Sequence, residues 1–136
     1  MEFPPVSIII VNYDGISLLQ DCFESLKKVT YPNLEIILVD NGSSDGSVDF
    51  IKQNYPDTTI LELGKNLGFA FPNNQGARKS KGAYLLFLNN DTIVSPNFVS
   101  ELVEVMESDK EIGIAQSLLL TKEGEIDSSG DFMEPL

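Results

Sequence analysis

An apolar run that ends in three oxygen-bearing side chains is the part of this sequence best suited to chemistry. Residues 85–88 are all apolar, and Asn89, Asn90 and Asp91 follow directly. In open α/β sheets, ligands bind in the crevice outside the carboxyl ends of the strands. A carboxylate flanked by amide carbonyls suits a hard cation such as Mg²⁺ or Mn²⁺, which in turn holds a phosphorylated ligand. The simpler alternative is turn chemistry, because asparagine and aspartate also favour turns through local hydrogen bonds.

Two other apolar runs also end in polar side chains. Residues 6–11 are followed by Asn12 and Tyr13, and residues 36–39 are followed by Asp40. Because the carboxyl ends of parallel strands lie at one edge of a sheet, we expect these residues to converge with the first group. Asp40 is suited to accept a hydrogen bond from a heterocyclic N–H, with metal ligation as the alternative, and Tyr13 is suited to stack on the base.

Alternating strand and helix signals predict the framework that positions these residues. The alternation implies an α/β fold, a doubly wound and mainly parallel sheet with right-handed crossovers, as one domain over residues 1–136. Ser43 or Ser44 is predicted to cap the second helix, and Pro96 to occupy the first position of the last one. Strands are predicted at 6–11, 36–39, 58–63, 83–88 and 112–120, and helices carry the apolar stripes that begin at Leu18, Val48, Phe69 and Phe98.

Composition and charge exclude several classes of function. The net charge of −12 argues against nucleic acid, or an anionic membrane, as the main partner. The chain has no histidine, which excludes His-containing zinc sites and Ser-His triads. Cys22 is the single cysteine, lies among apolar residues, and is predicted to be a core thiol in a reducing, cytoplasmic setting. No apolar run approaches the length of a membrane span.

Five ordered blocks resemble the nucleotide-diphospho-sugar glycosyltransferases with the GT-A fold, within glycosyltransferase family 2. The resemblance extends over nearly the whole chain and is closest to members related to rhamnosyl- and galactofuranosyl-transferases. Those members often carry an Asn-x-Asp form of the family's Asp-x-Asp motif, as at 89–91 here. The five blocks are residues 6–13, 39–47, 66–70, 73–77 and 88–92.

The resemblance implies a role for each matching residue. Asn12 and Tyr13 would lie against the nucleoside, and Asp40 would bind the base, typically through a pyrimidine N–H. Asp91 would ligate the Mg²⁺ or Mn²⁺ that bridges the diphosphate and stabilises charge on the leaving group. The other implied donor contacts are Asn66, Gly68, Asn74, Asn89 and Asn90, of which Gly68 permits a close backbone approach or an unusual φ.

Two departures from the family pattern limit how far these residue roles can be carried over. Phe71-Pro72 replaces a small, often glycine-rich pair, so this loop is expected to be stiffer. Relatives supply the carboxylate that deprotonates the acceptor in a later half, and Asp127, Asp131 and Glu134 come too early to match it. The general base is therefore expected outside this chain, and the fold is expected to be truncated at its C-terminus.

The sequence thus predicts the donor-binding half of a metal-dependent, inverting glycosyltransferase of cell envelope polysaccharide biosynthesis. It would transfer a sugar from a nucleoside diphosphate sugar to an acceptor hydroxyl. The alternative is a non-catalytic nucleotide or nucleotide-sugar binding module or subunit. Expected partners are the donor, a saccharide or lipid-linked acceptor, no nucleic acid, and a second copy at the truncated sheet edge. The full-length protein is expected in the cytoplasm, with the inner membrane face as a compatible location.

Overall fold

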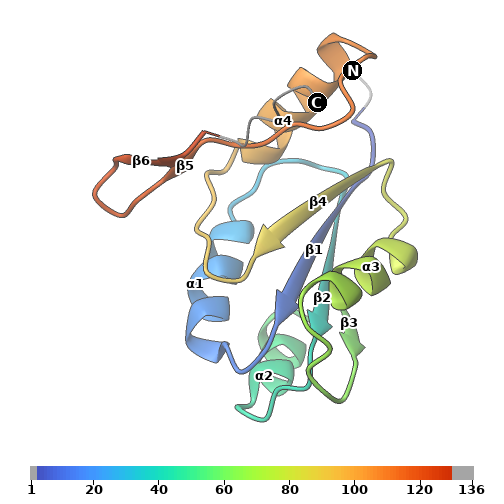
Figure 1. Cartoon of the computed structure of the whole chain (residues 1–136), viewed down its shortest axis with the longest axis vertical. Coiled ribbons are helices and arrows are strands. Elements are labelled where there is room, and N and C mark those ends of the chain that lie inside the picture. The colour runs from blue at the N-terminus through green and yellow to red at the C-terminus, as the bar shows by residue number, and fades with distance from the viewer. Residues whose placement is uncertain (1–2, 130–136) are drawn as a thin grey trace, which may run out of the picture.

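A four-stranded parallel sheet forms the centre of the computed structural model, which describes residues 3–129 (Figure 1). Its strands stand in the order β3-β2-β1-β4. The register pairs Asn12 with Asp40 and Val11 with Asn89, so the polar strand ends lie at one level. The strands are β1 (Val6–Asn12), β2 (Leu34–Asp40), β3 (Thr59–Glu62) and β4 (Tyr84–Asn89).

Helices cover both faces of this sheet, as a doubly wound fold requires. Helices α1 (Ile16–Leu26) and α2 (Ser47–Asn54) lie on one face, and α3 (Ala70–Lys79) lies on the other (Figure 1). Helix α4 (Phe98–Ser108) extends the core on the first face through Phe98 and Val99. The predicted fold class is confirmed.

Strand β1 is buried on both sides, which explains its continuous apolar sequence. Ile8 and Ile10 join the large core cluster beneath α1 and α2, whereas Ile9 packs beneath α3. A Cβ on Gly76 of α3 would lie 2.5 Å from Ile9 Cγ2. The absence of a side chain at Gly76 therefore lets α3 approach the sheet closely.

The buried stripe of α1 follows helical spacing and includes Leu19, Cys22, Phe23 and Leu26. Cys22 is fully buried and unpaired, which confirms the predicted core thiol. Burial, with the Asp91 carboxylate as the second cause, raises the pKa of Cys22 to about 12. The thiol therefore stays protonated at neutral pH and is a packing group.

The connections change direction between β1 and β4. From β1 the chain runs outward through α1 to β2 and through α2 to β3, then returns over the opposite face through α3 to β4. Adjacent parallel strands whose following segments diverge leave a crevice at their carboxyl ends. The fold therefore predicts a ligand site next to Val11 and Asn89.

The predicted fifth strand at 112–120 is wrong. Only β5 (Leu119–Leu120) is a strand, and it pairs antiparallel with β6 (Ile126–Ser128) in a hairpin that projects away from the sheet (Figure 1). Ile114 is 91% exposed. The segment 112–118 is apolar in composition, but it pairs with no strand among the described residues, so β4 remains an edge.

Two predicted helix starts are also corrected. Helix α2 begins at Ser47, after Gly46 with φ 86°, and the Asp45 carboxylate accepts from Ser47 N, so neither Ser43 nor Ser44 is its cap. Helix α4 begins at Phe98, two residues after Pro96.

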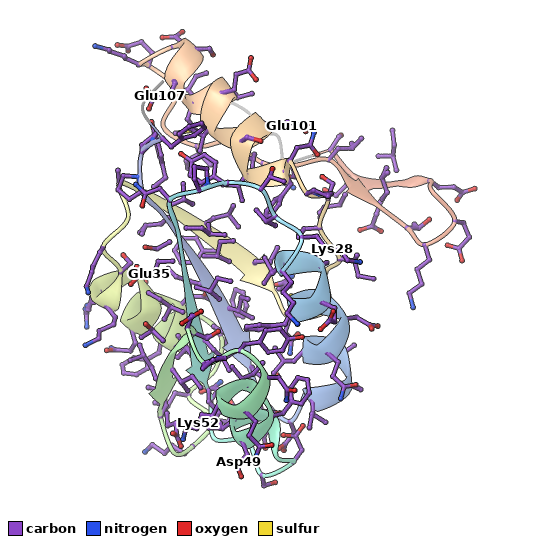
Figure 2. All side chains as sticks on the ribbon, turned by 180° about the vertical axis from the view of Figure 1, so that it is seen from behind. Lys28, Glu35, Asp49, Lys52, Glu101 and Glu107 are labelled. Carbon is purple, nitrogen blue, oxygen red and sulfur yellow. The ribbon has the colours of Figure 1, made fainter. Side chains whose placement is uncertain are left out.

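Most of the charged side chains in residues 3–129 lie on the outer surface. Seen from behind, Asp49 and Lys52 lie on the outer side of α2 (Figure 2). Lys52 Nζ is 2.7 Å from Glu62 Oε1, an exposed pair. No helix within residues 3–129 has the length and apolar character needed to cross a membrane.

Candidate functional site at the carboxyl ends of the strands

A pocket of about 400 Å³ opens at the carboxyl ends of β1 and β4, where the fold predicts a ligand site. One wall comes from the strand ends and the other from the loop before α3 and its first turn. The lining residues are Val11, Tyr13, Asn41, Asn66, Gly68, Phe69, Asn73, Phe87, Leu88, Asn89 and Asn90.

A chain of hydrogen bonds fixes the three strand ends relative to one another. Asn90 Nδ2 donates to Asn12 Oδ1 at 2.9 Å, and Asn12 Nδ2 donates to Ser43 Oγ at 3.1 Å. The same hydroxyl accepts from Asp14 N at 2.9 Å. Asn12 is only 1% exposed. It therefore acts from beneath the pocket, as a brace between β4 and the turn after β2.

Gly15 makes room for this brace. A Cβ at position 15 would lie 2.6 Å from both Asn12 Oδ1 and Asn90 Nδ2. Heavy-atom contacts that short force a side chain to move. The glycine at the start of α1 is therefore a requirement of the Asn12–Asn90 pair.

Asn41 holds the opposite wall of the pocket. Its Nδ2 donates to Asn66 Oδ1 at 3.0 Å and to Gly68 O at 2.9 Å, while its Oδ1 accepts from Leu67 N at 2.9 Å. Gly68 has φ 78°, which matches the predicted unusual φ, and nothing lies within 4 Å of the position that a Cβ would take. The loop 66–68 is thus pinned to the end of β2.

Asp40 lies beneath the pocket and has one oxygen without a partner. Its Oδ2 accepts from Gly42 N at 3.2 Å and Ser43 N at 3.0 Å. Its Oδ1 is buried, with no hydrogen-bond partner among the described residues. A buried carboxylate oxygen without a donor is costly, which makes this atom a candidate acceptor, although Asp40 itself is not among the residues that line the pocket.

Asp45 anchors the two helices that begin beside the site. Its Oδ2 accepts from Ile16 N at 2.9 Å, and its Oδ1 accepts from Ser47 N at 3.0 Å and from the Ser47 hydroxyl. Burial alone would raise the pKa of Asp45, but the hydrogen bonds from Ser47 and Ile16 outweigh it and lower the pKa. This single carboxylate therefore fixes the amino ends of α1 and α2.

Asp91 is the predicted metal ligand and is exposed beside the pocket, in the turn after β4. No group of three or more Cys, Asp or Glu side chains within residues 3–129 is arranged to hold a metal ion. Mg²⁺ in phosphate sites is usually held by one or two carboxylates together with substrate phosphates and water. The single carboxylate of Asp91 fits a cation that arrives with a diphosphate. It does not fit a metal that is held by protein side chains alone.

The predicted site residues are thus placed in two groups. Asn12, Asp40 and Asp91 lie beneath or beside the pocket, and Asn74 is exposed on α3 outside the lining. Tyr13, Asn66, Gly68, Asn89 and Asn90 line the pocket. Asp131 and Glu134 lie outside the described residues. The roles assigned to all these residues remain predictions.

Sequence reasoning missed six lining residues as site residues: Val11 and Leu88, which belong to predicted buried strands, and Asn41, Phe69, Asn73 and Phe87. Asn41 and Asn73 lay inside blocks of the resemblance, but each has a local explanation as turn or helix chemistry. Phe69 and Phe87 are 68% and 54% exposed. Large aromatic side chains predicted in a helix and a strand are ordinarily core residues, and no sequence signal marked them as exposed.

The fold and the pocket define an α/β protein with a pocket at the topological switch point of a parallel sheet. Residues 7–127 match the family model of glycosyl transferase family 2. Two curated relatives are the O-antigen biosynthesis protein RfbC of Myxococcus xanthus and the glycosyltransferase GlyG of Streptococcus pneumoniae, with 34% and 33% identity over 93% and 80% of this chain. The chain belongs to glycosyl transferase family 2, which confirms the resemblance. It spans only 10% and 38% of these two relatives.

Solved structures with the same fold include a mannosyltransferase from Pyrobaculum calidifontis in complex with GDP-Man and Mn²⁺. Its TM-score is 0.76 at 23% identity, covering 83% of this chain and 35% of that one. TarS of S. aureus (residues 1–349), in complex with UDP-GlcNAc, aligns with a TM-score of 0.70 at 19% identity, covering 84% and 38%. These alignments confirm the GT-A fold.

Proposed function

We propose that residues 1–136 form the N-terminal, nucleotide-sugar-binding part of a glycosyltransferase. The observation that carries the proposal is the convergence of three strand ends on one pocket, joined through Asn90, Asn12 and Ser43. The reaction would transfer the sugar from a nucleoside diphosphate to an acceptor hydroxyl with inversion. Relatives of similar fold bind GDP-Man with Mn²⁺ and UDP-GlcNAc, which supports this class of donor.

Asp40 would receive the base of the nucleotide. Its unpartnered Oδ1 needs an N–H donor, and a pyrimidine ring N–H supplies one. The neighbouring turn 42–43 already holds Oδ2, so only Oδ1 is free to accept. Tyr13, half-exposed on the pocket wall, would then stack on the base.

Asp91 would hold a divalent cation, Mg²⁺ or Mn²⁺, against the diphosphate. When bound, this cation supplies positive charge that stabilises the leaving nucleoside diphosphate. Asn89 and Asn90 present amide groups next to Asp91, at the position where the ribose and sugar would lie. The chain's net charge of −12 makes a cation more necessary, because an anionic donor would otherwise meet a repulsive surface.

A non-catalytic binding module is the second candidate, and one observation favours it. None of the described residues that line the pocket is a carboxylate, lysine or histidine, so Tyr13 is the one lining side chain of a type that takes part in general acid–base catalysis. In the transferase proposal the base comes from residues outside this chain. In the second candidate the chain binds a nucleotide or nucleotide-sugar without transferring it.

The relatives support a proposal for the acceptor and the cellular role. One is an O-antigen biosynthesis protein, which supports a saccharide or lipid-linked acceptor and a role in cell envelope polysaccharide synthesis. Such an acceptor would be met in the cytoplasm or at the inner membrane face. Self-association remains a prediction, and the open edge of β4, with exposed Leu85 and Phe87, is the surface on which it depends.

Calorimetric titration of the purified chain with UDP, dTDP, GDP and ADP, each with Mn²⁺ and again with a chelator, tests the proposal. Metal-dependent binding of a nucleoside diphosphate is the expected result, with a pyrimidine preferred. Binding that persists equally in chelator would remove the metal from the proposal. Absence of binding by all four would contradict a donor site in this chain.

A further inference from the structure

The pocket is electrically neutral in a chain that is otherwise heavily charged. None of its eleven described lining residues is Asp, Glu, Lys or Arg. Charged residues make up 22% of the sequence, so about two would be expected among eleven. Lys65 and Asp91 are sequence neighbours of lining residues, yet neither lines the pocket. Charged residues therefore lie next to the pocket lining in sequence but are not part of it.

The lining has two kinds of groups instead. Five asparagine side chains line the pocket, and Tyr13, Phe69 and Phe87 supply ring surface. Asn41 is bonded to the loop 66–68, and Asn73 and Asn90 each donate within the protein, so only part of the hydrogen-bonding capacity of these amides is left for a ligand. Paired donors and acceptors match hydroxyl groups, which both donate and accept. Aromatic rings match the apolar C–H faces of a sugar ring or the plane of a base. Together these groups suit an uncharged, hydroxyl-bearing ligand.

An anionic sugar would be disfavoured in this pocket. No lysine or arginine lines the pocket to pair with a sugar carboxylate, and the Asp40 and Asp91 carboxylates next to the pocket would repel it. The diphosphate is itself anionic, so it fits better outside the pocket, past Asn90 and toward the Asp91 cation. The pocket is then left for the neutral parts of the donor.

We propose that this pocket selects a donor whose sugar carries no negative charge, and that it discriminates against uronic acids. The inference rests on the proposed function and specifies its substrate class. N-acetylated sugars are neutral and fall within the accepted class. Phe69 is the discriminating wall residue, because it is 68% exposed and stands at the start of α3, where a charged replacement would face the ligand.

Paired titrations in Mn²⁺ test this selection. UDP-glucose is compared with UDP-glucuronic acid, and GDP-mannose with GDP-mannuronic acid, with UDP and GDP alone as references. For the base that binds, the neutral donor should bind at least about tenfold more tightly than its charged partner. Equal or tighter binding of a charged partner overturns the inference, and so does equal binding of every sugar form and its parent diphosphate.

The reference titrations separate this inference from the proposed function. If UDP or GDP alone binds but the neutral and charged sugars do not differ, the donor site stands and only the sugar selection fails. If neither the diphosphates nor the sugar nucleotides bind, both the donor site and the selection fail.

A matched pair of variants gives a second readout. Phe69→Lys places an ammonium in the lining and should improve uronic acid binding relative to the neutral sugar by about fivefold or more. Phe71→Lys changes the net charge equally at a 46% exposed position outside the lining, and should leave that ratio unchanged. Both sugars carry the same diphosphate, so its attraction to the new lysine cancels in the ratio. An unchanged ratio in Phe69→Lys, or equal changes in both variants, overturns the assignment of Phe69.

Discussion

The Asn90 side chain donates from Nδ2 to Oδ1 of Asn12 at 2.9 Å, which joins the turn after β4 to the end of β1. The two residues are 78 positions apart in the sequence. Asn12 continues the connection to Ser43 after β2. One buried amide therefore sets the relative positions of three strand ends that border the pocket.

Replacing Asn12 by alanine should both destabilise the fold and weaken nucleotide binding. The change leaves the amide of Asn90 without its acceptor and removes one of the two hydrogen bonds that the Ser43 hydroxyl accepts, which costs about 1–3 kcal/mol. Urea unfolding and nucleotide titration measure the two effects. Gln53→Ala, on the exposed side of α2, is the control and should change the unfolding free energy by less than about 0.5 kcal/mol. A stable Asn12→Ala variant with normal binding would show that the brace is dispensable.

Gly15→Ala tests the space that the brace requires. The new methyl would lie 2.6 Å from both Asn12 Oδ1 and Asn90 Nδ2, so one side chain must move. We expect a loss of about 1–3 kcal/mol in unfolding free energy, as for other overpacked sites, together with weaker nucleotide binding. Gly113→Ala is a matched control, because nothing lies within 4 Å of the position that its new methyl would take and its φ is not positive. Equal stability of the two variants would contradict the steric argument.

Asn41→Asp tests the loop that forms the second wall. The substitution keeps the shape but removes both N–H donors, and it turns a carboxylate toward Asn66 Oδ1 and Gly68 O. Displacement of the loop should weaken nucleotide binding about tenfold, which corresponds to ~1.4 kcal/mol. Asn54→Asp makes the same charge change on α2, where Nδ2 donates to Phe50 O, and should leave binding unaltered. Similar affinities for both aspartate variants would exclude a positioning role for Asn41.

Asp45 should make stability depend on pH in the acid range. Its folded pKa is lowered below the ordinary value of 3.8, so its contribution is complete above that value and is lost as pH falls through the folded pKa. Asp45→Asn should therefore be less stable than the parent near neutral pH, by about 1 kcal/mol as for the loss of a helix cap. The difference should shrink below about pH 4. Unfolding free energies of the parent and of Asp45→Asn, measured across this pH range, test the prediction. A stability difference that stays constant with pH would contradict the role of Asp45.

Sequence patterns predicted the framework because each central strand is a local apolar run with turn signals on both sides. The run at 6–11 indicated a strand buried on both faces, and β1 is buried in that way. The predicted strand at 112–120 failed for a physical reason. A strand needs a partner edge, and the apolar composition around Ile114 does not say whether one is within reach.

The site was predictable only in its location. Parallel strands bring Asn12, Asp40 and Asn89 to one edge, which the sequence order alone implies. The hydrogen bonds between them depend on register and on side-chain rotamers. Ser43 shows the limit, because the hydroxyl predicted to cap a helix instead bonds Asn12 and Asp14. Local and long-range uses of the same hydroxyl have the same sequence signature.

A titration followed by ¹H–¹⁵N correlation spectra tests the central claim most directly. The nucleoside diphosphate that binds most tightly is added with Mg²⁺, and amide shifts are mapped along the chain. We predict the largest changes at Tyr13 and at Gly68, on the two walls of the pocket, with Gly82 at the opposite edge of the sheet unaffected. The Asp91→Ala variant should remain folded and lose the metal-dependent changes. Shifts centred near Gly82, or no shifts at the pocket, would contradict a donor site at the carboxyl ends of the strands.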